Sequence, residues 1–277
     1  MNKPILSIII ANYNYGRFLE AAIKSVVEQE GFDQCELIVV DGGSTDNSVD
    51  VIKKYEDKIA WWVSEKDKGQ SDAFNKGFEH ARGRLGCWVN ADDLLLPGTL
   101  RSVLDYLVYH PQCEWITGGT IFFDEKLIIW RARIGTWITD NMHKWVDPTV
   151  IGGPTSFFSI DRLRNVGGFN LKLRFTMDGD LWNKFFHVGM KMCHINHYFW
   201  GFRVHEASKT SHSLSNDRSE AFALEDSIVF SRRNYTAHEM LVAGRKLFVW
   251  KILNGSIIKS AFDTFRLKGK NILSFKG

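Results

Sequence analysis

The chain has 277 residues, of which 44% are hydrophobic and 24% are charged, and it contains only 5 prolines. This composition excludes a disordered, collagen-like or coiled-coil protein, and the length suits one large α/β unit or two domains of about 150 residues. No apolar run approaches the roughly 20 residues needed to cross a bilayer, and no signal-peptide cleavage site follows the N-terminus. We therefore expect a cytoplasmic protein, soluble or peripheral to a membrane.

The formal net charge of +3 is unevenly distributed. Residues 231–277 hold ten basic and two acidic side chains, a net charge of +8, which leaves −5 for the rest of the chain. A basic tail on an acidic body indicates an anionic partner, either nucleic acid or anionic lipid. The four cysteines lack C-x-x-C spacing, which argues against a zinc ribbon or a redox pair.

The first half of the chain alternates strand and helix patterns at short spacing, as a mostly parallel sheet requires. The continuous apolar run at 5–11 is typical of a strand that is buried on both faces. Further strands are expected at 36–40, 61–63 and 85–89, and helices at about 17–27, 47–55, 72–81 and 97–107.

The second half has a different pattern, with antiparallel strands expected first and helices last. The expected strands lie at 115–123, 127–134, 155–160, 190–195 and 198–204, with a helix at 180–188. Residues 246–266 fit one helix with an apolar stripe flanked by basic residues. This helix would either pack on the rest of the protein or lie on an anionic membrane surface.

Polar side chains follow three of the predicted strands. Asn12 and Tyr13 follow the first strand, Asp41 the second, and Asp92 and Asp93 the fourth. Ligands of open α/β sheets bind at this edge, although each cluster alone also fits a turn or a helix cap. Adjacent carboxylates at a buried strand end repel each other unless a donor or a cation compensates, as Mg²⁺ or Mn²⁺ bound with substrate phosphates would.

Three common nucleotide-binding and hydrolase motifs are absent: G-x-G-x-x-G, G-x-x-x-x-G-K-[ST] and G-x-S-x-G. Their absence argues against hydride transfer, kinase-like chemistry and serine hydrolysis. The remaining interpretation is a site at the sheet edge in which phosphate is held through a metal ion.

The chain resembles the family-2 glycosyltransferases, which have the nucleotide-sugar-binding fold called GT-A. The resemblance covers about residues 4–210 and rests on the order of ILSIIIANYNYGRFLEAAIKSV, ELIVVDGGSTDNSVDVI, DKGQSDAFNKGFEHARGRLGCWVNADDLLLPG, GGFNLKLRFTMDGDLW and RVHEASKT. It implies a GT-A catalytic domain over 1–210, with a nucleotide-binding half at about 1–110 and an acceptor half at about 111–210. Residues 211–277 would form a basic helical extension.

The resemblance implies a role for each matching position on the donor side. Ala11 and Tyr13 would frame the nucleobase, usually uracil, and Asp41 would hydrogen-bond to it. The pocket for the ribose and the donor sugar would be lined by Lys68, Asp72 and Asn75.

The resemblance also implies a divalent cation, Mn²⁺ or Mg²⁺. Asp92 and Asp93 match the D-x-D region, with Asp93 ahead of Asp92 as the direct metal ligand. Asn90 stands where many relatives have the first aspartate, which would lower metal affinity. His205 matches a position that some relatives place against the metal or the diphosphate, and Lys209 would add a positive charge for phosphate.

The catalytic base is expected in the second half of the chain. The resemblance assigns it to Asp178, with Asp180 as the alternative, although Met177 departs from the family's Glu-Asp pattern. An acceptor hydroxyl is a poor nucleophile at neutral pH, and a nearby carboxylate can take its proton in the transition state. Without the resemblance, the two carboxylates could equally be the acidic N-terminus of a helix.

We therefore expect an inverting, metal-dependent glycosyltransferase that uses a UDP-sugar or a similar donor. Its acceptor would be a glycan or a lipid-diphosphate-linked sugar of a bacterial surface polysaccharide, reached at the inner face of the plasma membrane. One alternative is a nucleotidyltransferase that makes the activated sugar, but a glycine- and lysine-rich N-terminal phosphate loop is missing. Another is a nucleic-acid-binding protein, against which the acidic body argues.

Overall fold

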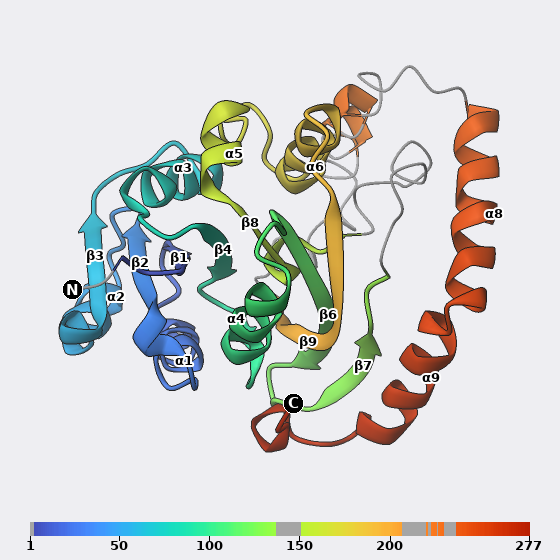
Figure 1. The fold of residues 1–277 in the computed structure, drawn as a ribbon. Helices are drawn as coiled ribbons and strands as arrows, with labels where there is room; N and C mark the ends of the chain where they lie inside the picture. Colours follow the sequence, from blue (N-terminus) through green and yellow to red (C-terminus); the bar gives the residue numbers. More distant parts are fainter. Residues whose placement is uncertain (1–2, 137–150, 207–219, 221–222, 226, 230–236) are drawn as a thin grey trace.

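The computed structural model describes residues 3–136, 151–206, 220, 223–225, 227–229 and 237–277. A nine-stranded sheet runs through the described part of the chain in the order β3-β2-β1-β4-β8-β6-β9-β5, with β7 paired to β6 (Figure 1). Helices lie on both faces of this sheet. The α/β fold class expected from the sequence is confirmed.

The first half of the sheet is parallel, with β1 between β2 and β4, and β3 at the edge. The strands expected at 5–11, 36–40, 61–63 and 85–89 and the helices expected at 47–55 and 72–81 lie within two residues of their observed bounds, whereas the short strand at Leu94–Leu95 was not predicted. The elements are β1 (Leu6–Asn12), α1 (Gly16–Val27), β2 (Cys35–Asp41), α2 (Ser48–Lys54), β3 (Ile59–Ser64), α3 (Gln70–His80), β4 (Leu85–Asn90), β5 (Leu94–Leu95) and α4 (Thr99–Tyr109), with short 3-10 turns at Phe32–Gln34 and Glu56–Lys58.

The second half of the sheet is mixed, since β6 runs antiparallel to β7 and β8 but parallel to β9. Its elements are β6 (Trp115–Asp124), β7 (Ile129–Arg133), a 3-10 turn at Gly153–Thr155, β8 (Ser156–Ser159), α5 (Ile160–Asn165), α6 (Met177–His187) and β9 (Met192–Val204).

Three expectations for this half were wrong in detail. The two strands expected at 190–195 and 198–204 form one continuous strand, β9. Helix α6 begins at Met177, so Asp178 and Asp180 both lie in its first turn. The strand expected to reach residue 160 stops at Ser159, because the Ser159 side chain accepts a hydrogen bond from the Arg162 amide and caps α5.

The C-terminal helices are α8 (Ala237–Leu253) and α9 (Ser256–Leu267), followed by a 3-10 turn at Ile272–Ser274. The single helix expected over 246–266 is wrong, because Gly255 has φ of 75° and the Asn254 side chain caps α9. None of the described helices is long and apolar enough to cross a bilayer. The domain boundary expected near residue 210 falls outside the described residues and stays a prediction.

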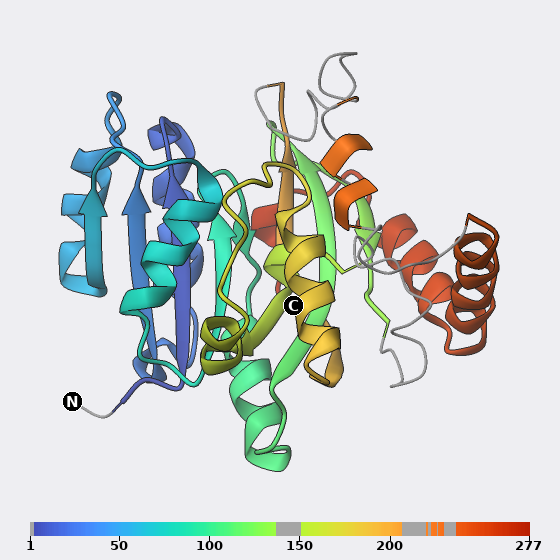
Figure 2. The same cartoon turned by 90° about the horizontal axis from the view of Figure 1, so that it is seen from above.

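Helix α9 lies along β7 and supplies hydrogen bonds to the open edge of that strand (Figures 1 and 2). The Thr264 hydroxyl accepts from the Ala132 amide and donates to the Ala132 carbonyl, both at 3.0 Å. The Ser260 hydroxyl accepts from the Ile134 amide, also at 3.0 Å. Because exposed strand edges invite unwanted pairing, these contacts protect the edge as well as anchoring the helix.

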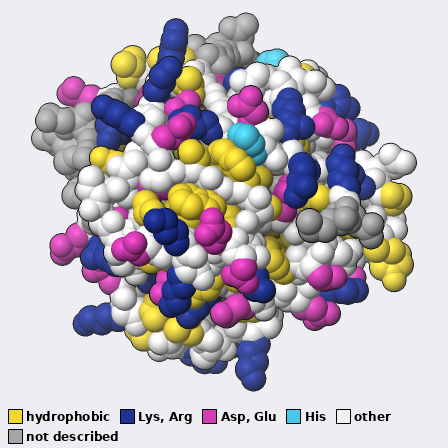
Figure 3. All heavy atoms as spheres, turned by 90° about the vertical axis from the view of Figure 1, so that its left-hand side faces the viewer, with side chains coloured by type: hydrophobic (Ala, Val, Ile, Leu, Met, Phe, Trp, Pro, Cys, Tyr) yellow, Lys and Arg dark blue, Asp and Glu magenta, His cyan; other side chains and the backbone are white. Residues whose placement is uncertain are grey.

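The opposite edge of the sheet, at β3, has a mixed charge distribution. Acidic and basic side chains are interspersed on this face (Figure 3). Ion pairs join α2 to α1 through Lys54 and Glu20, at 2.8 Å, and α3 to the segment after β3 through Lys76 and Glu65, at 2.7 Å. This face therefore shows no surface of a single sign that would attract a polyanion.

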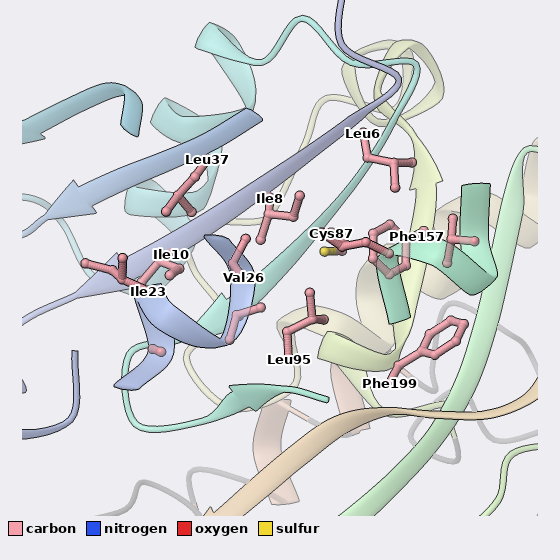
Figure 4. Packing of buried hydrophobic residues seen from close by; sticks show 14 of the residues in the cluster. Leu6, Ile8, Ile10, Ile23, Val26, Leu37, Cys87, Leu95, Phe157 and Phe199 are labelled. Carbon is pink, nitrogen blue, oxygen red and sulfur yellow. The ribbon is translucent and has the colours of Figure 1, made fainter. Parts of the chain in front are cut away.

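The core lies on both faces of the sheet, which explains the continuous apolar run of β1. Ile8 and Ile10 pack with Ile23 and Val26 of α1 on one face (Figure 4). Ile9 points to the other face, into a cluster that includes residues of α3 and α6. The prediction of a strand buried on both sides is confirmed, and the two layers hold the ends of β1 and β4 in fixed positions.

Candidate active site

A cavity of about 980 Å³ lies at the carboxyl ends of β1 and β4. Segments after these strands form one side of it, and β6, β7, β9, the start of α6 and the end of α8 form the rest. The predicted site residues that line it are Ala11, Tyr13, Lys68, Asp92 and Asp178. Those that the structure places outside its lining are Asp41, Asp72, Asn75, Asp93, Asp180 and His205. Lys209 lies outside the described residues.

Asp92 and Asp93 have different surroundings, although they are adjacent in the chain. Asp93 is 1% exposed, and its two oxygens accept hydrogen bonds from the Arg203 amide at 2.9 Å and the Asn90 side chain at 2.7 Å. Burial, followed by repulsion from Asp92, raises the pKa of Asp93 well above its usual range. Asp92 lines the cavity. Of the two expected metal ligands, Asp92 is therefore the one at the cavity, and the expectation that Asp93 binds the metal directly stays a prediction.

Asn90, which replaces the first aspartate of the family pattern, joins two neighbouring segments. Its amide nitrogen donates to Asp93, and its oxygen accepts from the Gln70 side chain at 2.9 Å. An aspartate at this position could not donate, and it would add a third carboxylate beside two others. The asparagine thus stabilises the charged turn after β4.

His205 lies behind Asp92 rather than in the cavity lining. Its Nε2 atom is 3.0 Å from Asp92 Oδ2, and its side chain is buried. The imidazole packs against the rings of Tyr15 and Phe18, with centroids at 5.8 Å and 5.0 Å. In this position His205 can orient the carboxylate of Asp92, and the expectation that it binds the metal directly stays a prediction.

Arg203 places a buried cation beside the two carboxylates. Its Nε donates to the Asp92 carbonyl at 2.7 Å, and its guanidinium lies 4.7 Å from the ring centroids of both Phe18 and Phe123. Burial lowers the pKa of Arg203, while the charges of Asp93 and Asp92 oppose that shift. From the sequence, a metal ion or a hydrogen-bond donor is expected to compensate the charge of these carboxylates. Arg203, which no sequence pattern indicates, supplies part of this compensation.

Asp41 is fully buried beneath the turn after β2 and does not reach the cavity. Its two oxygens accept hydrogen bonds from the side chains of Asn12, Ser44 and Ser64 and from the Ser44 amide, at 2.5 to 2.9 Å. Burial alone would raise the pKa of Asp41, but these hydrogen bonds outweigh it and lower the pKa below its usual range. The acceptor sites of Asp41 are thus used within the protein, and the expectation that it hydrogen-bonds to the nucleobase stays a prediction.

Asp67 provides a carboxylate in the cavity near the position expected of Asp41. A Cβ atom placed on Gly42 would lie 2.6 Å from Asp67 Oδ2 and 3.3 Å from the Tyr13 ring, so the three positions adjoin one another. The other oxygen of Asp67 accepts from the Gly69 amide at 2.8 Å. No sequence pattern singled out Asp67, since its position depends on the close approach of two loops over a residue without a side chain.

Asp72 and Asn75, both on α3, support the cavity without lining it. Asp72 Oδ2 accepts from the Lys68 amide at 3.0 Å and so fixes the loop that carries this lysine into the cavity. The Asn75 side chain pairs with both backbone groups of Phe169, at 2.8 and 2.9 Å. Both residues thus hold segments beside the cavity, and their expected place in the ribose and donor-sugar pocket stays a prediction.

Asp178 and Asp180 are separated by the geometry of the first turn of α6. Asp178 lines the cavity, and its Oδ1 accepts from the Gly179 amide at 2.8 Å. Asp180 is buried on the other side of the helix, with Oδ2 3.1 Å from the Lys184 ammonium. Of the two candidates for the catalytic base, the structure presents only Asp178 to the cavity.

Glu225 holds the segment that leads into α6. Its carboxylate accepts hydrogen bonds from the consecutive amides of Arg174, Phe175 and Thr176, at 2.9, 2.7 and 3.1 Å. These amides precede Met177, the first residue of α6, so Glu225 holds the segment that leads to Asp178. Sequence analysis missed this residue because it lies about 50 positions away.

The described residues hold no group of three or more histidine, cysteine, aspartate or glutamate side chains arranged to bind a metal. Asp92 with His205 behind it is the arrangement that a divalent cation could use. Mg²⁺ is commonly held by one or two carboxylates together with substrate phosphates, so such a site would be completed by the donor diphosphate.

A family model described as glycosyl transferase family 2 matches residues 7–162, more than half of the chain. The chain belongs to glycosyltransferase family 2. This membership favours glycosyl transfer over the nucleotidyltransferase and nucleic-acid-binding alternatives, and it confirms the family resemblance read from the sequence.

Two curated relatives of this family-2 chain match it over shorter stretches. An uncharacterized glycosyltransferase of Nostoc is 42% identical over 104 residues, which are 36% of this chain and 32% of the relative. The minor teichoic acid biosynthesis protein GgaB of Bacillus subtilis is 33% identical over 123 residues, 43% of this chain and 14% of GgaB. The chain thus spans a third or less of the length of these two proteins.

Two solved structures show the same fold at low sequence identity. TarS of S. aureus (residues 1–349) in complex with UDP-GlcNAc has a TM-score of 0.62 at 17% identity, with 90% of this chain and 74% of TarS covered. The mannosyltransferase PcManGT of Pyrobaculum calidifontis in complex with GDP-Man and Mn²⁺ has a TM-score of 0.65 at 17% identity, with 88% and 70% covered. Together with the family match, they confirm the predicted GT-A fold.

Proposed function

We propose that this chain transfers a sugar from a nucleotide-sugar to a hydroxyl group of a surface glycan or lipid-linked acceptor, with inversion at the transferred carbon. The observation that carries the proposal is the single cavity of about 980 Å³ that Tyr13, Asp92 and Asp178 line together. A donor-side carboxylate and a separate base are the two groups that a single displacement needs. The relation to GgaB supports an acceptor in cell-surface glycan synthesis.

The donor is proposed to be a UDP-sugar, bound at the ends of β1 and β4. Tyr13 is 59% exposed in the cavity and can stack on the base, while the Asp67 carboxylate beside it can accept a hydrogen bond from a ring N–H. Lys68 supplies a positive charge near the phosphates. The complexes of TarS with UDP-GlcNAc and of PcManGT with GDP-Man support a nucleotide-sugar donor. They leave uracil and guanine as the two nucleobases to compare.

Mn²⁺ or Mg²⁺ is proposed to bind at Asp92, with His205 fixing the orientation of the carboxylate. When bound, the cation stabilises the negative charge that develops on the leaving nucleoside diphosphate. Arg203 compensates the charge of the turn after β4 from the protein side, and Asn90 keeps that turn in place. The Mn²⁺ in the PcManGT complex supports this assignment.

Asp178 is proposed to take the proton from the acceptor hydroxyl as the bond to the sugar forms. The Oδ1 atom of Asp178 accepts a hydrogen bond from the Gly179 amide, which fixes the direction of the carboxylate at the cavity wall. Glu225 keeps the preceding segment in position. A positioned base of this kind contributes about 10²- to 10⁴-fold to a rate.

The test combines nucleotide binding with turnover, on the full chain. Thermal unfolding with UDP, GDP, dTDP, CMP or AMP, with and without Mn²⁺, should show one nucleotide that stabilises the protein by about 2.7 kcal/mol at 100 times its dissociation constant. Asp178→Asn should lose at least about 100-fold in turnover and keep its nucleotide affinity. Asp180→Asn is the matched control and should keep turnover per folded molecule. Full activity in Asp178→Asn would remove Asp178 from the role of base.

We further propose that α8 and α9 bring the enzyme to an anionic membrane surface. Large apolar side chains are exposed along both helices, among them Phe262 at 63% and Phe265 at 85%, which share one face of α9 with Ile258. Basic residues flank them on the same helices: Arg245, Lys246, Lys259 and Arg266. Such a face suits the headgroup region of a membrane, where each basic residue adds about 1 kcal/mol.

Flotation with phosphatidylglycerol vesicles tests this surface. Phe262→Ser combined with Phe265→Ser should abolish binding of the full chain to the vesicles. Val108→Ser combined with Tyr109→Ser removes two equally exposed apolar side chains from α4 and should leave binding unchanged. Equal loss in both double variants, or no loss in the first, would contradict the assignment.

A further inference from the structure

Two basic side chains line a part of the cavity that the donor site does not explain. Arg133 is the last residue of β7, and Lys251 lies in the last turn of α8. Burial, followed by repulsion from Arg133, lowers the pKa of Lys251 to about 8. Among the described residues, no hydrogen bond or ion pair to the Lys251 ammonium is found. Two cations held together in a partly dry cavity favour an anion between them.

The segments that carry the two residues are held by contacts of neighbouring side chains. The Asn254 side chain, one turn beyond Lys251, donates to the Thr136 hydroxyl at 2.6 Å, near Arg133. The Thr264 hydroxyl bonds to both backbone groups of Ala132, next to Arg133. The end of α8, which carries Lys251, is therefore tied to the segment that follows β7, the strand of Arg133. The pair is preorganised, which lowers the entropic cost of holding a ligand.

The pair is also separate from the residues assigned to the donor. Tyr13 follows β1 and Asp92 follows β4, whereas β7 joins the sheet at β6, beyond β8 (Figure 1). Asp178, the proposed base, lines the same cavity as Arg133 and Lys251. An anion held by Arg133 and Lys251 would thus enter with the molecule that approaches the base.

We propose that Arg133 and Lys251 bind a phosphate group of the acceptor, so that the acceptor of this enzyme is a phosphate- or diphosphate-bearing molecule. This inference rests on the proposed glycosyl transfer and narrows its acceptor class. The Arg133 guanidinium can hold two phosphate oxygens in a fixed plane, and the Lys251 ammonium supplies a point charge from α8. Lys251 thereby gives the C-terminal helix a direct part in acceptor selection.

Binding of inorganic phosphate to the full chain tests the site, with the donor site first filled by saturating UDP, or by GDP if that nucleotide binds instead. Calorimetry should detect phosphate binding to the wild type, and Lys251→Gln should weaken it by about tenfold or more, the loss of one charge-assisted contact. Lys246→Gln, on an exposed position of the same helix, is the matched control and should bind phosphate as the wild type does. Lys251→Arg keeps the charge and should retain most of the affinity.

The outcomes separate this inference from the proposed function. Unchanged phosphate affinity in Lys251→Gln, or no phosphate binding to the nucleotide-filled wild type, would overturn the site. If Lys251→Gln weakened UDP or GDP as much as phosphate, the anion would be the donor diphosphate, which overturns the assignment to the acceptor. If no nucleotide bound to the wild type but phosphate binding depended on Lys251, the proposed function would fail while the anion site stood.

Discussion

The buried charge of Lys251 predicts that replacing this residue stabilises the protein at neutral pH. A pKa lowered from 10.5 to about 8 corresponds to at most about 3–4 kcal/mol of unfavourable free energy in the folded state, at about 1.4 kcal/mol per pH unit. The ammonium is only partly removed from water, so about 1–2 kcal/mol is the figure to expect. Lys251→Met should therefore raise the midpoint of thermal unfolding by about 2–6 °C at pH 6.5.

The stabilisation that Lys251→Met produces should depend on pH. Below pH 8 the lysine is charged in both the folded and the unfolded protein, and its cost is fully present. As the pH rises from 8 towards 10.5, the folded protein has lost the proton that the unfolded chain still binds, so the cost declines. The difference between Lys251→Met and the wild type should thus shrink between pH 6.5 and pH 9.5, while Lys246→Met, on the exposed face, changes little at either pH. A destabilised Lys251→Met variant at pH 6.5, or a difference that grows with pH, would refute the reasoning.

Two further predictions concern residues of the candidate site, and a third concerns Asp263, which joins α9 to Tyr198 of β9. Glu225→Gln should lower kcat by about tenfold with little change in the KM of the donor, because the segment before α6 loses a charged acceptor. An unchanged kcat in steady-state kinetics would mean that Glu225 does not position Asp178. Burial would raise the pKa of Asp263, but hydrogen bonds from Lys259 and Tyr198 outweigh it and lower the pKa. Asp263→Asn should therefore lose about 1–3 kcal/mol in urea unfolding at pH 7, and the gap from the wild type should close below pH 4; a constant gap would contradict this. Asp67→Ala should weaken nucleotide binding by about tenfold in calorimetry. An unchanged affinity would mean that the nucleobase does not contact Asp67.

Local sequence patterns predicted the fold where each element is decided by its own residues. The apolar run of β1, buried on both faces, identified a central strand and with it the edge at which ligands gather. The break between α8 and α9 was missed because one glycine at positive φ outweighs a continuous apolar stripe. The first turn of α6 was missed for a related reason, since Gly179 and the polar residues beside it weaken the helical pattern.

The site was predictable as a set of segments but not as a set of side chains. The sequence indicates that Asp92 and Asp93 follow β4, yet which of them faces the cavity depends on the Arg203 amide, 110 positions later. Likewise, Asp41 is turned away from the cavity, where Ser64 on the neighbouring strand donates a hydrogen bond to its Oδ2 atom. Lys251 of α8 lines the same cavity as Arg133 of β7, although the two residues are far apart in the sequence. Contacts between distant segments leave no periodic signal along the chain.

The central claim is that Asp92 is the carboxylate through which a divalent cation and the donor diphosphate are bound. Calorimetry of UDP and GDP with the wild type, Asp92→Asn and Asp93→Asn, each with and without Mn²⁺, tests it directly. We predict that Mn²⁺ strengthens nucleotide binding to the wild type and that Asp92→Asn abolishes this strengthening. Asp93→Asn, whose side chain is buried, should keep the Mn²⁺ effect in the folded fraction. Retention of the Mn²⁺ effect in Asp92→Asn and its loss in Asp93→Asn would contradict the account.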